Sequence, residues 1–329
     1  IINVLSSMEK EGINIDSSYL NKLEKEFEKD LNKLKKEIYN QSDEEFNLNS
    51  PKQLGDILFD KLKLVSKPKK TKTGQYSTSE EVLSGLASDH EIIRSILEWR
   101  SLDKLQNTYV KSLPNEVSSK TNKIHTKFNQ TVTTTGRLSS NNPNLQNIPI
   151  RTKNGQKIRK AFIPRNSDFE LMAADYSQIE LRVIASMSKD TNMIDAFVKN
   201  QDIHTITASK IYNVNPDEVT REQRGNAKTV NFGIIYGVSA FGLSQQTNLT
   251  RSESKIMIEN YFENYPGLKT YMSNQIDFAR AKGYVETIMG RRRYLQNINS
   301  QNNMLRSGSE RNAINAPIQG SAADIIKIA

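Results

Sequence analysis

The stretch AADYSQIELR, residues 173–182, says most about the fold and chemistry of this chain. Its first three residues are the end of the apolar run FELMAAD, residues 169–175. This run predicts a buried strand that ends at Asp175. The chain then turns within a few residues into a predicted helix that carries Glu180. Divalent ions such as Mg²⁺ take hard oxygen ligands, usually including one or two carboxylates. Asp175 is therefore a candidate metal ligand, although an isolated Asp after a strand is more often a helix cap or a turn former.

A second stretch, VTREQRGNAKTVNFGIIYG at residues 219–237, predicts one helix. It opens with Thr220, followed three residues later by Gln223, which is the spacing of a capping box. It closes at Gly237, and glycine is the residue that most often adopts the left-handed conformation after a helix. These two signals set the limits of the predicted helix.

Four side chains of this predicted helix share one broad face. Arg224, Lys228, Phe232 and Tyr236 are each four residues apart, and every such step drifts by only about 40° around a helix. A helix face with two cations is too polar to be buried in a core. A face that is simply exposed to water would not be expected to carry two large aromatic rings. A nucleoside triphosphate matches the row, with its phosphates at the cations and its sugar and base at the rings. The spacing leaves an ordinary mixed surface open as the alternative.

Hydrogen-bonding side chains gather in two further segments, residues 133–151 and 310–327. The minor groove of DNA presents acceptors at every base pair, so donors there can test pairing geometry without reading sequence. A turn-forming surface loop and a solvated helix face are the respective alternatives. The candidate donors are Arg137, Asn144 and Gln146 in TTTGRLSSNNPNLQNIPIR, and Arg311, Asn315 and Gln319 in ERNAINAPIQGSAADIIK.

The first third of the chain predicts helices. Residues 20–38 and 92–109 carry apolar side chains at steps of three and four, and a further helix is predicted to begin at Ser50. From Ile124 the pattern changes to short β-rich pieces, and beyond Gln178 it is mostly helical again. The chain therefore belongs to the mixed α+β class.

A basic loop is predicted at residues 65–81, VSKPKKTKTGQYSTSEE, because this segment has no periodic apolar pattern. Its Lys69, Lys70 and Lys72 are either solubilising charges or contacts to phosphate. The whole chain has 46 Lys and Arg against 37 Asp and Glu, a formal charge of +9 that favours a polyanionic partner without proving one.

Composition excludes several other classes of protein. With no cysteine there is no disulfide framework and no thiolate metal site, and three histidines are too few for a zinc cluster. No apolar run approaches the roughly 18 to 20 residues of a membrane span. We therefore predict a soluble, cytoplasmic protein without a membrane partner. The chain starts at Ile1 and stops inside a predicted helix, so we expect both ends to be cuts.

Four motifs together resemble family A DNA polymerases of the bacterial DNA polymerase I type. They are DYSQIELR, TGRLSS followed by PNLQNIP, RGNAKTVNFGIIYG and NAPIQGSAAD. Weaker pieces such as STSEEVL, DIHTITA and GYVETIMGRRRYL resemble the same family in the same order, so the likeness covers nearly the whole chain.

The resemblance implies an α+β right-hand polymerase fold. Residues 1–114 would form mostly the helical thumb, with a short leading palm segment, and 115–188 the β-sheet palm. Residues 189–300 would form the helical fingers, and 301–329 a helix that returns to the palm. The palm would be incomplete, because the family's third motif, which bears the second metal-binding aspartate, is expected after Gln319 and is not found.

The resemblance also implies roles for individual residues. Asp175 and Tyr176 would bind metal, and Asp175, Arg224 and Lys228 would act in catalysis. Glu180 and Tyr236 would exclude a ribose 2′-hydroxyl, and Phe232 would discriminate against dideoxynucleotides. The incoming dNTP would be bound by Arg224, Lys228, Phe232, Tyr236, His204, Glu180 and Gln178, and DNA by Arg137, Asn144, Gln146, Arg311, Asn315, Gln319, Lys69, Lys70 and Lys72.

The implied reaction is attack of a primer 3′-hydroxyl on a dNTP with the help of two Mg²⁺ ions. The partners would be primer-template DNA and dNTPs, and the protein would be a monomer acting in replication and repair. Two hypotheses follow. In the first the protein is a DNA polymerase. In the second the 329 residues alone bind primer-template and dNTP without turnover, since only Asp175 can be nominated as a metal-binding aspartate.

Overall fold

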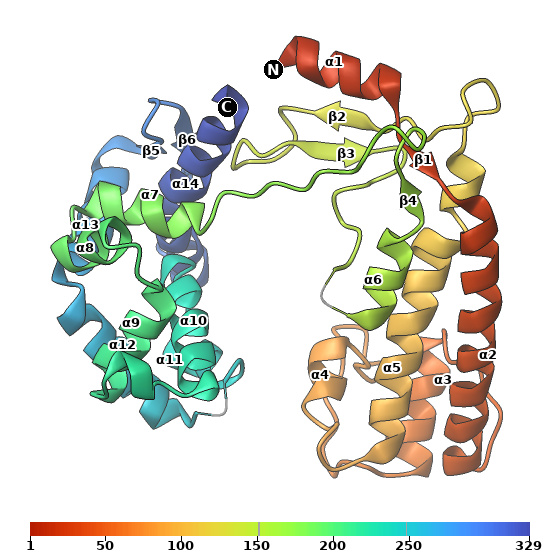
Figure 1. Cartoon of the computed structure of the whole chain (residues 1–329). Coiled ribbons are helices and arrows are strands. Elements are labelled where there is room, and N and C mark those ends of the chain that lie inside the picture. The colour runs from red at the N-terminus through yellow and green to blue at the C-terminus, as the bar shows by residue number, and fades with distance from the viewer. Residues whose placement is uncertain (151, 248) are drawn as a thin grey trace. The chain divides into compact units, whose positions relative to one another are not determined.

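The computed structural model describes residues 1–150, 152–247 and 249–329, and it divides the chain into two compact units. The N-terminal unit comprises residues 2–129 and 140–172. The C-terminal unit comprises residue 1, residues 130–139 and residues 173–329. Both units are drawn in Figure 1, and each is described by itself below.

The N-terminal unit is mostly helical. Its α-helices are α1 (Ile2–Glu11), α2 (Ser17–Ser42), α3 (Pro51–Gly55), α4 (Glu80–Ser84), α5 (Glu91–Leu105) and α6 (Lys153–Arg159). The π-helices η1 (Asp56–Lys61) and η2 (Gln106–Val110) extend α3 and α5, and η3 (Leu113–Glu116) is a 3₁₀ turn. Its strands are β1 (Asn14–Ile15), β2 (Lys127–Asn129), β3 (Ser139–Asn141, whose first residue belongs to the other unit) and β4 (Phe162–Ile163).

The predicted helices of this unit are confirmed, and so are the faces that they bury. In α2, Leu20, Leu23 and Phe27 are buried against α5, and the two helices run side by side in Figure 1. The hydroxyl of Ser50 caps α3 by accepting a hydrogen bond from the amide of Gln53. The side chain of Gln53 accepts from the amide of Asn47 instead of Ser50, so the predicted capping box forms only in part.

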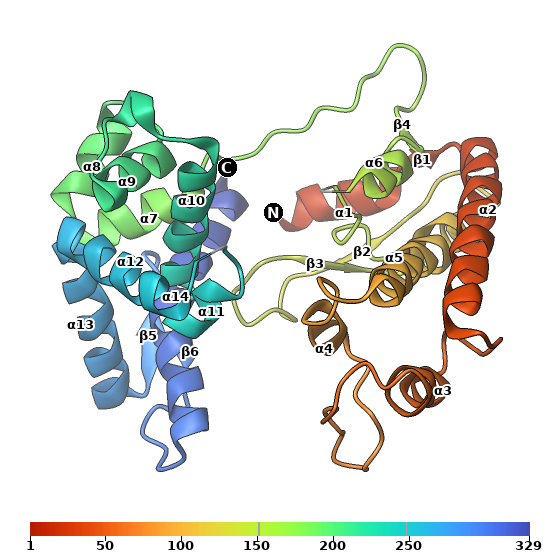
Figure 2. The same ribbon diagram turned by 90° about the horizontal axis from the view of Figure 1, so that it is seen from below.

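The C-terminal unit is mostly helical and carries one short hairpin of two strands. Its helices are α7 (Ile179–Ser188), α8 (Thr191–Val198), α9 (Ile203–Tyr212), η4 (Pro216–Glu218), α10 (Arg221–Ile235), α11 (Ala240–Ser244), α12 (Arg251–Asn264), α13 (Pro266–Lys282) and α14 (Asn303–Ile328). Its strands are β5 (Tyr284–Glu286) and β6 (Arg292–Tyr294). The main core draws on every α-helix of the unit, from α7 to α14, and Figure 2 shows α10 beside α9.

Three two-stranded sheets form among the described residues: β1 with β4, β2 with β3, and β5 with β6. In the antiparallel hairpin β5–β6, Tyr284 faces Tyr294 and Glu286 faces Arg292. The α+β class predicted from sequence is therefore confirmed, with helices dominating both units.

The predicted buried strand at residues 169–175 is wrong. The segment has no regular structure and every residue in it is exposed, including Leu171 at 54% and Met172 at 90%. A strand needs a neighbour to satisfy its backbone N–H and C=O groups, and no strand within the described residues pairs with this segment. Its apolar composition predicted burial, but no partner strand is available to provide it.

The predicted basic loop is confirmed as exposed. Lys69, Lys70 and Lys72 all lie at the surface, and the ammonium of Lys70 sits 4.9 Å from the centre of the Tyr76 ring.

Across the described parts of the chain, no helix combines the length and the apolar character that crossing a bilayer requires.

Candidate functional site

Helix α10 forms as its sequence predicts. The hydroxyl of Thr220 accepts from the amide of Gln223, and the side chain of Gln223 accepts from the amide of Thr220, which completes the capping box. The helix ends before Gly237, which takes a left-handed backbone with φ +68°. The capping signals therefore fix this helix at both ends.

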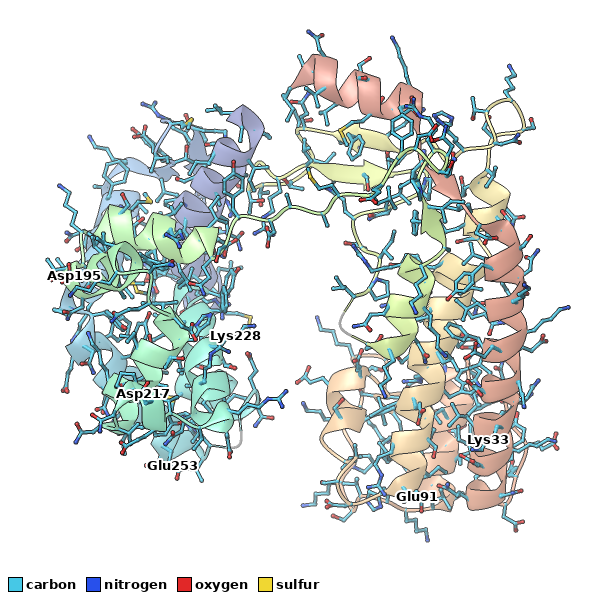
Figure 3. All side chains as sticks on the ribbon, viewed as in Figure 1. Lys33, Glu91, Asp195, Asp217, Lys228 and Glu253 are labelled. Atoms are coloured by element: carbon cyan, nitrogen blue, oxygen red, sulfur yellow. The ribbon has the colours of Figure 1, made fainter. Side chains whose placement is uncertain are left out.

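The predicted row on α10 lies on one exposed side of the helix. Arg224 and Lys228 are exposed, Phe232 is half-buried and Tyr236 is 39% exposed. Figure 3 shows the side chain of Lys228 projecting from α10. The opposite side of the helix is buried in the core of the unit. The surface therefore runs from two cations to two aromatic rings, as the spacing predicts.

The guanidinium of Arg224 has an internal partner. Its Nε donates to Oδ2 of Asp202 at 2.6 Å, and Asp202 also caps α9. Burial alone would raise the pKa of Asp202, but hydrogen bonds from Arg224, Thr205 and the amide of His204 lower it to about 2. Asp202 is therefore ionised at neutral pH and neutralises the first cation of the row.

His204 lies inside the unit, with only 3% of its surface exposed. Its Nδ1 accepts from the amide nitrogen of Asn231 at 3.1 Å, so the proton of the neutral ring is on Nε2. Its ring lies 5.7 Å from that of Phe232, centre to centre. Burial lowers the pKa of His204 to about 4, which keeps the imidazole neutral at physiological pH.

The buried His204 should make the fold sensitive to acid. Its pKa falls from 6.5 to about 4 on folding, so between these values the unfolded chain binds more protons and stability drops as pH falls. Between pH 7 and pH 4.5 we expect urea unfolding to show a loss of about 2 kcal/mol from this residue. A His204→Gln variant should lose that part of the pH dependence, whereas His90→Gln should retain it. Equal pH profiles for His204→Gln and the parent would contradict the assignment.

A second cluster of polar side chains surrounds Glu180, a residue of α7 with only 7% of its surface exposed. Its Oε2 accepts from the hydroxyl of Tyr236 at 2.6 Å, and its Oε1 pairs with the guanidinium of Arg137. The side chain of Gln319 also lies close to the hydroxyl of Tyr236. Burial and the bond to Glu180 raise the pKa of Tyr236, so its hydroxyl stays protonated and donates. We call Arg137, Glu180, Tyr236 and Gln319 the carboxylate cluster.

Helix α14 carries the predicted donors Arg311, Asn315 and Gln319, and this side of the helix reaches the end of α10. Arg311 is exposed, and its side chain crosses Gly237 so closely that a Cβ there would lie 2.6 Å from Cγ of Arg311. Oδ1 of Asn315 is buried and has no hydrogen-bond partner among the described residues. Gln319 reaches Tyr236. The α10 row and the α14 row therefore meet at Tyr236 and Gly237.

Asp175, Tyr176 and Gln178 precede α7 directly. Asp175 and Tyr176 are exposed, and Gln178 caps the helix with a left-handed backbone at φ +54°. No group of three or more metal-binding side chains forms anywhere in the described ranges. Because Mg²⁺ needs only one or two protein carboxylates when phosphates complete its shell, an exposed Asp175 fits one such ligand.

Over residues 17–329 the chain matches the family model described as DNA polymerase family A. The chain belongs to this family. It is 52% identical over 327 residues to DNA polymerase I of Geobacillus stearothermophilus and 51% identical over 324 residues to that of Bacillus subtilis. These alignments cover 99% and 98% of the chain, which spans 37% of the length of either relative.

A solved structure supports the family A fold. The chain is similar, with a TM-score of 0.91 and 45% sequence identity, to the POL domain of Pol1 from M. smegmatis, which was solved in complex with DNA primer-template and dNTP. The match covers 98% of this chain and 57% of that one. The expected α+β polymerase fold is thereby confirmed.

The remaining residues predicted to contact DNA lie in the N-terminal unit of this family A chain. Gln146 is exposed, whereas Oδ1 of Asn144 accepts from the amide of Gln146 at 3.0 Å and so also shapes its own loop. Sequence reasoning did not single out Asp202 or Asn231. Asp202 stands directly before a helix, where its capping role hides its pairing with Arg224, and Asn231 is one of many amides in the chain.

Proposed function

We propose that this protein is a template-directed DNA polymerase that adds dNTPs to a primer 3′-hydroxyl. The observation that carries the proposal is the exposed row on α10, whose Tyr236 end is bonded to Glu180. Membership of DNA polymerase family A supports it, as does the similarity to a polymerase domain solved with primer-template and dNTP. We also assign the enzyme to the cytoplasm, as a monomer acting in replication and repair.

In this proposal the α10 row binds the incoming dNTP. Arg224 and Lys228 hold the phosphates through charge-assisted hydrogen bonds, and Phe232 packs against the sugar and base. Arg224 can keep its Nε bond to Asp202 while its Nη groups donate to phosphate. The protonated Nε2 of the neutral His204 ring is a donor that can bind a phosphate oxygen without adding charge.

We assign the choice of sugar to the carboxylate cluster. Tyr236 and Glu180 are joined by a short hydrogen bond, so together they form one rigid wall where the sugar 2′ position would lie. A ribose hydroxyl would collide with this wall and a deoxyribose would not. Gln178, at the start of the helix that carries Glu180, completes the nucleotide site.

Asp175 and Tyr176 would hold Mg²⁺ at the exposed start of α7. When bound, the two ions of the complete enzyme supply the positive charge that favours an ionised 3′-hydroxyl and offsets charge on the leaving group. The primer oxygen forms a bond to the α-phosphorus, the bond to the pyrophosphate oxygen breaks, and the hydroxyl proton leaves to solvent. Arg224 and Lys228 would offset the negative charge that develops on the pyrophosphate.

We assign duplex binding to both units. In the C-terminal unit, the side chains that would donate to the minor groove are Arg137, Arg311, Asn315 and Gln319. In the N-terminal unit, Asn144 and Gln146 would make contacts of the same kind. Lys69, Lys70 and Lys72 would contact the phosphate backbone. With these roles, residues 1–114 are mainly thumb, 115–188 palm, 189–300 fingers and 301–329 a returning palm helix.

Single-nucleotide primer extension with Mg²⁺ tests the proposal. We would compare residues 1–329 with a version extended through the third family motif, which is expected after Gln319. The extended version should add the templated dNTP and lose this activity in EDTA. Residues 1–329 should bind primer-template without turnover, because we assign a single aspartate to metal.

The outcomes separate the two hypotheses. If the extended version folds, as judged by circular dichroism, and binds DNA but adds no nucleotide, the polymerase proposal is wrong. If residues 1–329 extend the primer alone, another carboxylate serves the second ion. Binding measured by fluorescence anisotropy should weaken as salt rises, since phosphate contacts release counterions.

A further inference from the structure

Arg291 stands at the turn between β5 and β6, and its backbone is fixed there. Its amide donates to Oγ1 of Thr287 at 3.2 Å, and its carbonyl accepts from the amide of Thr287 at 3.0 Å. Gly290, with φ +77°, closes the turn just before it. The side chain therefore starts from a defined position.

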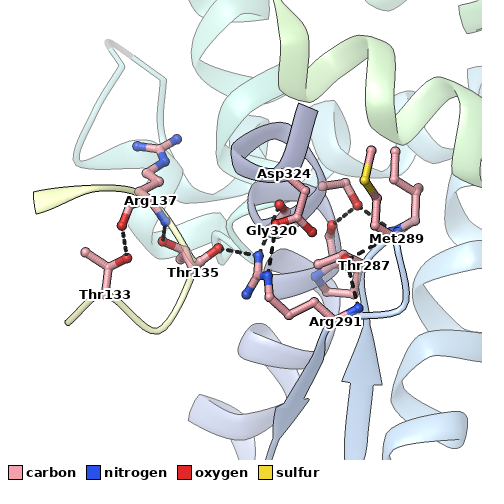
Figure 4. A network of polar contacts seen from close by, with 11 residues as sticks. Thr133, Thr135, Arg137, Thr287, Met289, Arg291, Gly320 and Asp324 are labelled. Atoms are coloured by element: carbon pink, nitrogen blue, oxygen red, sulfur yellow. Dashed lines mark hydrogen bonds and ion pairs between the residues drawn. The ribbon is translucent and has the colours of Figure 1, made fainter. Parts of the chain in front are cut away.

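The guanidinium of Arg291 joins three separate segments (Figure 4). Nε donates to Oδ1 of Asp324 at 2.9 Å, while Nη2 donates to the carbonyl oxygens of Thr135 at 2.8 Å and Gly320 at 3.2 Å. Oδ2 of Asp324 is buried without a hydrogen-bond partner in the described ranges, so Arg291 is its main compensating charge. The planar guanidinium holds its donors in a fixed geometry that serves a carboxylate and two carbonyls at once.

Glycine allows the close approach. A Cβ on Gly136 would lie 2.5 Å from Nη2 of Arg291, and a Cβ on Gly320 would lie 2.9 Å from the same atom. Gly136 also has φ +83°, a backbone conformation that other residues rarely adopt. The segment around Gly136 is thus shaped to lie directly against the guanidinium.

The residue after Gly136 is Arg137, which belongs to the carboxylate cluster. The amide of Gly136 donates to the carbonyl of Thr133 at 3.2 Å, and the hydroxyl of Thr133 donates to the carbonyl of Arg137. The side chain of Arg137 then pairs with Glu180 although it is 56% exposed. A half-exposed arginine has many rotamers in water, so its pairing depends on where its backbone is held.

We infer that Arg291 is a positioning residue, which holds the Thr135–Arg137 turn so that Arg137 meets the carboxylate shared with Tyr236. This inference rests on the proposed function, because it gives Arg291 a part in nucleotide selection without contact to the nucleotide. Arg291 acts through the Thr135 carbonyl and the surface of Gly136.

The test compares Arg291→Lys with Arg292→Lys in the extended polymerase. Arg292 is a matched control in the same hairpin, since it is more exposed and bonds Glu286 instead of the turn. Arg291→Lys should lower the rate of dNTP insertion about tenfold and narrow the preference for dNTP over rNTP by a similar factor. Arg292→Lys should leave both within about twofold of the parent.

A double-mutant cycle with Arg137→Ala identifies the route. If Arg291 acts through Arg137, the double variant should be no worse than Arg137→Ala alone. Losses that multiply, or a lower rate with unchanged sugar preference, would overturn the inference. Should Arg291→Lys not fold, Gly136→Ala takes its place in the same cycle, because its Cβ displaces the guanidinium.

Amide hydrogen exchange separates this inference from the proposed function. In residues 1–329, exchange at Gly136 and Arg137 should be about tenfold faster in Arg291→Lys than in the parent and unchanged in Arg292→Lys. This result requires no enzymatic activity. Unchanged exchange would sink the inference even if the polymerase is active, and accelerated exchange would sustain the positioning even if primer extension fails.

Discussion

Replacing Asp175 with Asn should lower primer extension by at least about a thousandfold, while DNA binding and the unfolding temperature stay near those of the parent. The rate falls because an amide is a poor Mg²⁺ ligand and the transition state loses a bound charge. Stability stays because Asp175 is exposed, in a segment without regular structure. Rapid-quench single-turnover kinetics on the extended polymerase measures the effect.

Asp168→Asn is the control for that experiment. Asp168 is an exposed aspartate seven residues earlier in the chain, and the same charge change there should leave the rate unaltered. If Asp175→Asn retains more than about a tenth of the parent activity, Asp175 is not a metal ligand and the assignment fails.

Glu180→Ala should reduce the preference for dNTP over rNTP on the order of a hundredfold, equivalent to about 3 kcal/mol. Removing the side chain opens space beside Tyr236 and deletes the acceptor of its hydroxyl. The fold should survive, because the Arg137 left unpaired is 56% exposed and can be hydrated. Competing single insertions of dCTP and CTP opposite a template guanine give the preference directly.

Glu180→Gln distinguishes size from charge. The amide has nearly the volume of the carboxylate and can still accept from Tyr236, so most of the preference should remain. A loss as large as in Glu180→Ala would show that the charge, and not the steric wall, selects the sugar. Glu259→Ala, at an exposed glutamate on α12, should change nothing.

The features predicted well from sequence are those set by local rules. The limits of α10 follow from a capping box and a glycine, and the exposed row follows from the period of the helix. Burial in α2 likewise follows from periodicity. Each of these signals lies within one turn or one helix.

The features that failed or were missed depend on distant partners. Residues 169–175 have a strand-like composition, but pairing decides whether a strand forms and no partner is present among the described residues. The bonds of Arg224 to Asp202 and of His204 to Asn231 join residues 22 and 27 positions apart. Spacing within one helix cannot reveal such pairs, because they arise only when helices pack. The thumb, palm and fingers boundaries stay predictions.

The bond between Arg224 and Asp202 should make the proposed nucleotide site selective among anions. Asp202 occupies only Nε of Arg224, so the Nη groups stay able to donate to an anion. An anion held there also lies near the Asp202 carboxylate, which repels it and offsets part of the attraction to the guanidinium. A triphosphate can reach Lys228 as well, one turn further along α10, and gains a second charged contact that chloride or a single phosphate lacks. The neighbouring carboxylate thus favours polyphosphates over small anions.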